Sequence, residues 1–306
     1  MIETQGLTKY YGRTRGIDGL DLSVEAGELF GFIGPNGAGK STTIRTLLGL
    51  LRPTRGSATV FGLDVTSRGT DIRRRLGYIP AEIGFYGGMT GEAILRLASR
   101  MHGIDPERGR EVAGRLDLDL RRKADELSTG NRKKLAIVLA LQHSPELVIL
   151  DEPSAGLDPL MQGVLFDLLR EEHRRGATVF FSSHVLDEVQ RMCRRVAIVR
   201  NGRIVEVAEI ETLRQRHLKR VRAVFPGEPP ARALAIDGVA NLTVDADSAR
   251  FDFTGPPRVL LTMLARRRVV DVSIEDPTLD DVFLHYYGSD AEDGDAEDGD
   301  TKEDSA

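Results

Sequence analysis

The stretch "GPNGAGKST" at residues 34–42 constrains the fold of this chain more than any other feature. It follows the apolar run Leu29–Ile33 and precedes a helix-like stretch, so a buried strand, a glycine-rich turn and a helix are expected in succession. In such a phosphate-binding loop (P-loop), the glycines let the backbone wrap phosphate groups, a lysine reaches the β and γ oxygens, and a hydroxyl ligates Mg²⁺. The pattern predicts a nucleoside triphosphate site, with Lys40 and Ser41 in the last two roles. The residues expected to contact the nucleotide are Gly34, Pro35, Asn36, Gly37, Ala38, Gly39, Lys40, Ser41 and Thr42.

Another apolar run, within "LVILDEPSAGLDP", ends in the carboxylates Asp151 and Glu152. A buried strand would deliver both to its C-terminal end, where open α/β sheets bind their ligands. We expect Asp151 to hold Mg²⁺ through water and Glu152 to polarise the attacking water, because phosphoryl transfer depends on positioning and charge stabilisation. The next apolar strand, in "VFFSSHVLDEV", ends at His184, which should then approach the γ-phosphate. Lys40, Glu152 and His184 are thus the expected catalytic residues.

An aromatic pair near the start of the chain, in "KYYG" at residues 9–12, offers Tyr11 as a stacking surface for adenine. Taken alone, a tyrosine in this position is more often a packing residue at the edge of a strand.

The first part of the chain, residues 1–216, alternates short apolar runs with helix-like stretches. Continuous apolar runs are typical of strands buried on both faces, which favours an α/β domain with a largely parallel sheet. "RNGR" at 200–203 is a hairpin signal, because Asn-Gly suits a two-residue turn. Residues 86–144 read as a helical subdomain that begins behind a Thr90 cap. The expected strands are Leu20–Val24, Leu29–Ile33, Leu147–Leu150, Thr178–Ser182 and Val196–Val199.

Residues 217–288 read as a second, small α+β domain. The apolar runs give the order strand, helix, strand, strand, helix, strand, and a closing helix over Leu279–Tyr287 follows. This βαββαβ order favours a ferredoxin-like domain. Its expected elements are the strands Val221–Phe225, Val239–Val244, Arg250–Phe253 and Val269–Ile274, with a helix over Arg258–Arg266.

The last stretch, residues 289–306, is a strongly acidic tail with nine acidic residues and one lysine. It lacks the apolar surface that ordering requires, so we expect disorder and no more than a solubilising role. Because the whole chain carries a net charge of −5, the remainder is mildly basic. It offers no aromatic-laced basic patch, and we expect no nucleic-acid partner.

Cysteine content and hydropathy predict the compartment. A single cysteine, Cys193, excludes an internal disulfide framework and suits a reducing cytosol. No apolar run approaches the ~20 residues that span a bilayer, and the first residues lack the pattern of a signal peptide. We expect a cytoplasmic protein that reaches the inner face of the cell membrane through a partner.

The motifs together, in this order and spacing, resemble the nucleotide-binding subunit of an ATP-binding cassette (ABC) transporter. The resemblance covers residues 2 to about 215, and "LSTGN" at 127–131 is similar to the family signature sequence. It implies an α/β P-loop ATPase fold in which two subunits pack head to tail. Ser128 and Gly130 of one subunit would then bind the γ-phosphate of the ATP held by the other. The family also gives Asp158 a role at the shared nucleotide site and supports those of Tyr11 and His184.

Two departures from the family pattern concern its polar contacts. Thr129 and Asn131 replace the usual Gly and Gln of the signature, although small or polar side chains should preserve binding in trans. Ala81 stands where the family usually has a glutamine that contacts Mg²⁺ and senses the membrane partner. The adjacent Glu82 is a candidate substitute as a metal ligand.

The last resemblance lies in "SIEDPTLDDVFLHYYG" at 273–288, which is similar to the ending of daunorubicin-resistance-type ATPases of ABC-2 exporters. It implies an ATPase that powers efflux of a drug, antibiotic or lipid, as a homodimer bound to an ABC-2-type membrane permease that would dock around Ile83–Met89. The alternative is a soluble ABC ATPase that moves no solute. Proteins of that class act, for example, in translation or cluster assembly. Those that act in translation usually carry two cassettes, whereas one P-loop is present here. A GTPase is disfavoured because no Asn-Lys-x-Asp base reader occurs.

Overall fold

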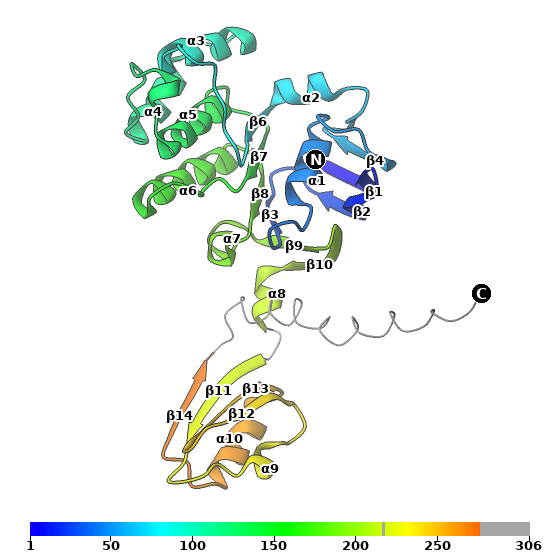
Figure 1. Cartoon of the computed structure of the whole chain (residues 1–306), viewed down its shortest axis with the longest axis vertical. Coiled ribbons are helices and arrows are strands. Elements are labelled where there is room, and N and C mark those ends of the chain that lie inside the picture. Colours follow the sequence, from blue (N-terminus) through cyan, green and yellow to red (C-terminus); the bar gives the residue numbers. More distant parts are fainter. Residues whose placement is uncertain (216–217, 276–306) are drawn as a thin grey trace, which may run out of the picture. The chain divides into compact units, whose positions relative to one another are not determined.

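The computed structural model describes residues 1–215 and 218–275, which fall into two compact units (Figure 1). The first comprises Met1–Glu209 and the second begins at Ile210. The expected boundary at residue 216 lies within the second unit. Each unit is described by itself.

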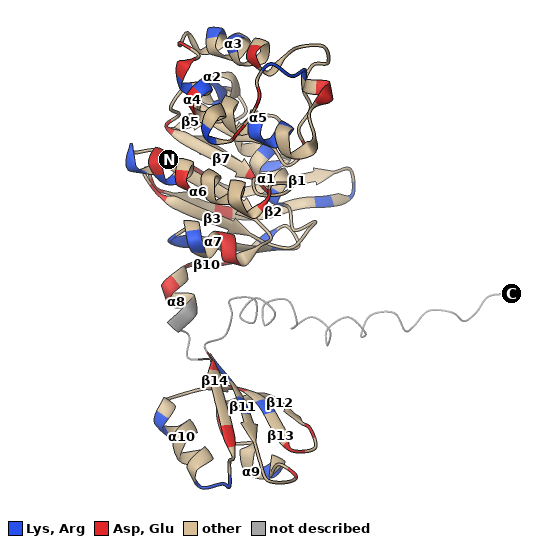
Figure 2. Ribbon diagram, turned by 90° about the vertical axis from the view of Figure 1, so that its left-hand side faces the viewer, with Lys and Arg blue, Asp and Glu red and all other residues tan. Residues whose placement is uncertain are grey.

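A six-stranded sheet forms the centre of the first unit, in the order β10-β9-β3-β8-β7-β6. The five strands from β9 to β6 run parallel, and β10 is antiparallel to β9, as the apolar runs and the hairpin signal predict. Asn201 and Gly202, in the turn between β9 and β10, have φ values of 49° and 76°, as a two-residue hairpin turn requires. In Figure 2, β3 and β7 are largely free of charged residues, which gather on surrounding helices and loops. The strands are β3 (Leu29–Ile33), β6 (Leu76–Ile79), β7 (Leu147–Asp151), β8 (Thr178–Ser183), β9 (Arg195–Arg200) and β10 (Arg203–Glu209).

A second, antiparallel sheet has the order β2-β1-β4-β5. Its strands are β1 (Ile2–Tyr11), β2 (Thr14–Val24), β4 (Arg55–Val60) and β5 (Leu63–Asp64). The sequence predicted only the apolar end of β2, because polar and apolar residues mix along the other strands. Helix α1 (Lys40–Leu47) packs against β2 and β4 of this sheet and against β7 of the other. One apolar core therefore joins both sheets through Ile44 and Leu47.

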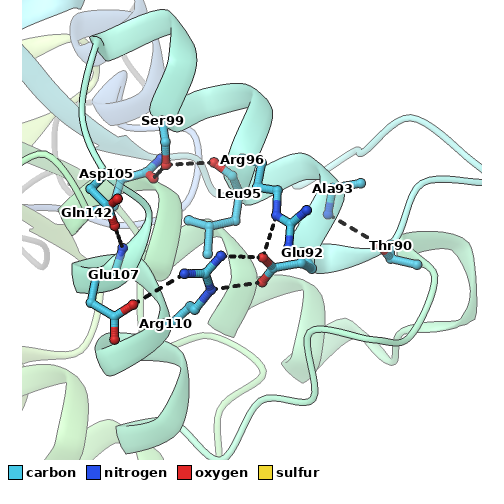
Figure 3. A network of polar contacts seen from close by, with 10 residues as sticks. All are labelled: Thr90, Glu92, Ala93, Leu95, Arg96, Ser99, Asp105, Glu107, Arg110 and Gln142. Atoms are coloured by element: carbon cyan, nitrogen blue, oxygen red, sulfur yellow. Dashed lines mark hydrogen bonds and ion pairs between the residues drawn. The ribbon is translucent and has the colours of Figure 1, made fainter.

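Three helices of the first unit, α3, α5 and α6, begin with a capping side chain. Thr90 caps α3, since its Oγ1 accepts the N–H of Ala93 at 3.2 Å, and Gly103 ends the helix with a φ of 67°. Figure 3 shows Arg96 and Arg110 donating to Glu92. The helices are α2 (Gly69–Arg75), α3 (Gly91–His102), α4 (Glu107–Arg115), α5 (Thr129–Leu141), α6 (Pro159–Arg174) and α7 (Leu186–Met192), with a 3₁₀ turn at Ala124–Glu126.

The helices α3, α4 and α5 gather together, away from the antiparallel sheet (Figure 1). In Figure 3, Ser99 of α3 donates to Gln142 at the end of α5, with an Oγ–Oε1 distance of 2.7 Å. Helices α6 and α7 pack against β8.

The second unit is a four-stranded antiparallel sheet in the order β12-β13-β11-β14, with chain order βαββαβ after α8. This arrangement agrees with the expected ferredoxin-like domain. A separate apolar core, which includes Phe251, Phe253 and Leu260, holds the sheet to its helices. The elements are α8 (Ile210–Gln215), β11 (Leu218–Val224), α9 (Ala231–Leu234), β12 (Val239–Val244), β13 (Ser248–Thr254), α10 (Pro257–Ala265) and β14 (Asp271–Glu275). The expected closing helix at 279–287 and the tail at 289–306 lie outside the described residues.

In the part of the chain that the structure describes, every helix is too short or too polar to cross a membrane.

Candidate nucleotide-binding and catalytic site

The P-loop connects the end of β3 to the start of α1, as the sequence predicts. Two of its glycines leave no room for a side chain. A Cβ on Gly34 would lie 2.3 Å from the carbonyl oxygen of Val199, and one on Gly39 would lie 2.6 Å from that of Gly16. Gly39 also has a φ of 102°, in the region that only glycine adopts easily. The loop is therefore held tightly by the neighbouring strands, with its N–H groups at a helix start.

Lys40, the first residue of α1, is a buried cation with three nearby oxygens. Its Nζ donates to the carbonyl oxygens of Gly34 at 2.7 Å and Pro35 at 3.1 Å. It also lies 3.2 Å from Oε1 of Glu152. The ammonium group thus lies where the P-loop meets the end of β7.

Glu152 follows the last residue of β7 and turns the chain sharply. Its φ of 50° is in the left-handed region, which is uncommon for a residue with a side chain and occurs often at functional sites. The turn places its carboxylate between two basic groups, because Oε2 lies 2.7 Å from Nδ1 of His184. His184 follows β8, which pairs in parallel with β7, so the strand order brings these residues together. The imidazole remains 48% exposed and can reach a ligand.

Asp151 is the last residue of β7 and is fully buried. Its Oδ1 accepts a long hydrogen bond of 3.4 Å from Ser182, whereas Oδ2 has no hydrogen-bond partner among the described residues. Burial raises the pKa of Asp151, and the polar influence of the nearby Ser41 hydroxyl works in the opposite direction. A buried carboxylate oxygen without a partner, next to a hydroxyl that also lines the cavity described below, fits the oxygen ligands that Mg²⁺ prefers.

A cavity of about 410 Å³ opens beside the P-loop. Tyr11 lines it, and its hydroxyl lies 3.4 Å from Oγ1 of Thr42. The wall consists of Tyr11, Thr14, Arg15, Gly16, Asn36, Gly37, Gly39, Lys40, Ser41, Thr42, Ala81 and Glu152. Sequence reasoning missed Thr14, Arg15 and Gly16. Their signal was the shortness of the β1–β2 turn after Tyr11, which forces the start of β2 to lie beside the aromatic ring.

The remaining candidate residues do not line this cavity. Ser128 caps α5 by accepting the N–H of Asn131 at 3.3 Å, and Asp158 caps α6 by accepting that of Met161 at 3.0 Å. A Cβ on Gly130 would lie 2.9 Å from the carbonyl oxygen of Gly156, so the start of α5 packs closely against the loop that precedes α6. Glu82 is exposed, and Ala81 rather than Glu82 faces the cavity.

The geometry combines a glycine-rich anion cradle, a buried lysine, a carboxylate suited to orienting water and a histidine in contact with that carboxylate. These are the parts that phosphoryl transfer to water requires, because the reaction depends on positioning and on stabilising negative charge.

Comparisons with known proteins agree with this chemistry. The model of the ABC transporter family matches residues 17–155. The daunorubicin/doxorubicin resistance ATP-binding protein of Streptomyces peucetius is 36% identical over 309 residues, covering 95% of this chain and 94% of that protein. The bacitracin transport ATP-binding protein of Bacillus licheniformis is 37% identical over 227 residues, covering 72% of this chain and 73% of that protein.

Solved structures show the same fold. A structure of the ATP-binding subunit of an ABC transporter has a TM-score of 0.66 and 32% identity, covering 70% of this chain and 92% of that one. A dimeric ATP-binding cassette in a post-hydrolysis state with ADP and Pi has a TM-score of 0.63 at 21% identity, covering 69% of this chain and 99% of that one. The chain therefore belongs to the ABC transporter family, as an ATP-hydrolysing subunit of the type found in export systems.

Proposed function

We propose that this chain works as a dimer that hydrolyses Mg²⁺-bound ATP at the inner face of the cell membrane and drives a separate ABC-2-type permease in efflux. The observation that carries the proposal is the position of Glu152, held between the P-loop lysine Lys40 and His184 beside the cavity. The similarity to the daunorubicin/doxorubicin resistance protein, which extends over 95% of the chain, supports the export role.

Each side chain has a distinct part in the proposed reaction. Lys40 binds the β and γ oxygens of ATP and stabilises the charge that develops on them. Glu152 orients the attacking water and accepts its proton, while His184 holds the Glu152 carboxylate and contacts the γ-phosphate. Tyr11 stacks on the adenine. Asn36, Gly37 and Gly39 hold the phosphates through their backbone N–H groups.

Ser41 and Asp151 are the residues that would hold Mg²⁺ in this proposal. When bound, the ion neutralises charge on the β and γ phosphates. The unpartnered Oδ2 of Asp151 supports this assignment. Glu82 is exposed, and as a metal ligand it would require the loop to rearrange.

The dimer supplies a use for the second helix start. Ser128 and Gly130 lie at the beginning of α5, outside the cavity, so they would bind phosphate from a partner subunit rather than their own. Asp158 would lie at the same shared interface. Two phosphate-binding turns in one chain thus give two shared ATP sites in a dimer.

The helical subdomain offers a surface for the permease. Tyr86, Leu97 and Met101 are large apolar side chains that are 81%, 46% and 78% exposed. Leu97 and Met101 are one turn apart on α3 and so lie side by side, as the apolar groups of a protein contact do. They support docking near the expected segment Ile83–Met89.

Affinity purification of the tagged chain from detergent-solubilised membranes of its host, followed by mass spectrometry, tests the proposal. A membrane protein with several spans, recovered in stoichiometric amount, is the expected partner. Its loss from a Tyr86→Asp, Met101→Asp variant would locate the contact, with Leu50→Asp, at another exposed apolar residue, as the control. Ribosomal or assembly proteins without a membrane chain would overturn the export role and favour a soluble ABC ATPase.

A further inference from the structure

Lys133 is a buried cation that the reaction described above does not use. It lies on α5, one turn after the helix begins at Thr129, and its side chain is 2% exposed. Its Nζ donates to the carbonyl oxygen of Pro80 at 3.1 Å. Burial of an ammonium group carries a large desolvation cost, which an apolar side chain at the same place would avoid. The group should therefore contribute something that packing does not require.

The hydrogen-bond partner of Lys133, Pro80, adjoins the wall of the proposed ATP site. Pro80 directly follows β6 and precedes Ala81, which lines the cavity. The methyl group of Ala81 can neither donate nor accept a hydrogen bond. The carbonyl of Pro80 consequently provides a polar link between this wall and α5.

The carboxylates at the end of β7 also act on Lys133. Burial lowers the pKa of Lys133 to about 8, and the charges of Asp151 and Glu152 partly oppose that shift. The ammonium group therefore lies in the electrostatic field of the proposed Mg²⁺ ligand and the proposed catalytic carboxylate. It links the helix that begins at LSTGN to the loop that carries Ala81 by a hydrogen bond, and it interacts with the end of β7 through charge alone.

We propose that Lys133 is a positioning residue for ATP hydrolysis, which ties α5 to the Pro80–Ala81 loop so that the cavity wall and the carboxylates of β7 keep one arrangement. A displacement of α5 is then transmitted to the wall through the Pro80 carbonyl. Hydrolysis is sensitive to such a displacement, because the attacking water must be held close to the γ-phosphate in a narrow range of geometry.

Lys133→Met in the full chain tests this role, because methionine retains the length and removes the charge and the donor. The turnover number kcat should fall about tenfold to a hundredfold, as expected when reacting groups shift by about 1 Å. The dissociation constant for ATP, measured in EDTA by calorimetry, should stay within about twofold, because Lys133 lies outside the cavity. The melting temperature should change little, because relief from burying a charge offsets the cost of leaving the Pro80 carbonyl without its donor.

Two further variants make the result decisive. Lys133→Arg retains a long side chain with N–H donors and should restore most of kcat. Lys134→Met makes the same change at the next position of α5, where the side chain is half-buried, and should leave kcat unchanged. Hydrolysis by the wild-type chain in the same assay tests the ATPase itself, so its failure is distinguishable from a failure of the Lys133 role.

The proposal is supported only if Lys133→Met loses turnover while it retains ATP affinity and stability, and Lys133→Arg recovers turnover. Wild-type turnover in Lys133→Met would overturn it. So would a loss of turnover accompanied by a lower melting temperature, or an equal loss in Lys134→Met.

Discussion

Glu152 adopts a backbone conformation that costs of the order of 1–3 kcal/mol for a residue with a side chain. The conformation turns its carboxylate out of the line of β7, where Lys40 and His184 hold it from two sides. The position of the proposed base is thus fixed before a substrate arrives, which is how a protein lowers the reorganisation that a reaction needs.

Glu152→Gln should retain ATP binding and lose hydrolysis. The amide keeps the shape and the hydrogen bonds but accepts a proton poorly, so phosphate release should fall by about 10²–10⁴-fold. The dimer closed on ATP should then accumulate, as gel filtration with ATP would show. Glu146→Gln is a matched control, because Glu146 forms an exposed ion pair with Arg75. Rapid phosphate release by Glu152→Gln would remove Glu152 from the mechanism.

The residues that sequence could predict are those at strand ends. Asp151, Glu152 and His184 follow continuous apolar runs, and parallel strands carry such ends to one edge of the sheet. Arg15 and Lys133 could not be predicted in the same way. The first depends on the register of β1 and β2, and the second on the distance between a helix and a loop that are 53 residues apart in the chain.

The turn between β9 and β10 is hydrogen-bonded to the P-loop and to β2 through the backbone of Gly202. The N–H of Gly202 donates to the carbonyl of Ala38 at 3.0 Å, and the carbonyl of Gly202 accepts the N–H of Asp18 at 2.8 Å. This hairpin was predicted from Asn-Gly alone, but its contact with the P-loop was not, because a turn signal carries no information about distant partners.

Gly202→Ala should destabilise the first unit by about 1–3 kcal/mol and weaken ATP binding. An added Cβ would lie 3.0 Å from the carbonyl oxygen of Gly16 and would strain a φ of 76°. Gly62→Ala is the control, since Gly62 has a similar φ of 72° and open space around its Cα. Urea unfolding and ATP titration should show the backbone cost in both variants and lower ATP affinity in Gly202→Ala alone. Equal ATP affinities would mean that the turn does not support the P-loop.

The start of α5 gives a second prediction at this scale. Ser128→Arg should leave ATP binding by the monomer unchanged and abolish ATP-dependent dimerisation, because a long cation replaces the small helix cap proposed to face the partner's phosphate. Ser128→Asn, which preserves the cap, should still dimerise. Sedimentation velocity with and without ATP measures both. Dimerisation of the Arg variant would refute the shared site.

At the scale of the whole molecule, the parallel sheet and the order of elements in the second unit were predictable from apolar runs. The antiparallel sheet of β1, β2, β4 and β5 was largely not, because half-exposed strands with register shifts lack a clear alternation. The boundary between the two units depends on which residues contact each other across it. The amino-acid composition of the sequence around residue 216 carries little information about those contacts.

Removal of residues 289–306 should leave kcat and the melting temperature of the chain unchanged. The segment is acidic throughout and contains no apolar side chain larger than alanine, so it can contribute little to a core. Steady-state phosphate release and thermal unfolding of the truncated chain measure both. A several-fold loss of kcat would show that the tail takes part in the ATPase cycle.

The contacts of Lys40 have a consequence for genetics. Its ammonium group joins the carbonyls of Gly34 and Pro35 to the carboxylate of Glu152, so substituting Lys40 changes the P-loop, the proposed phosphate contact and the proposed catalytic carboxylate at once. Defects from Lys40 and Glu152 substitutions should therefore combine far from additively in a double-mutant cycle. A Lys40 variant is therefore a poor inactive control in cells, because it alters the P-loop as well as hydrolysis. Glu152→Gln should leave the contacts of Lys40 with the Gly34 and Pro35 carbonyls in place.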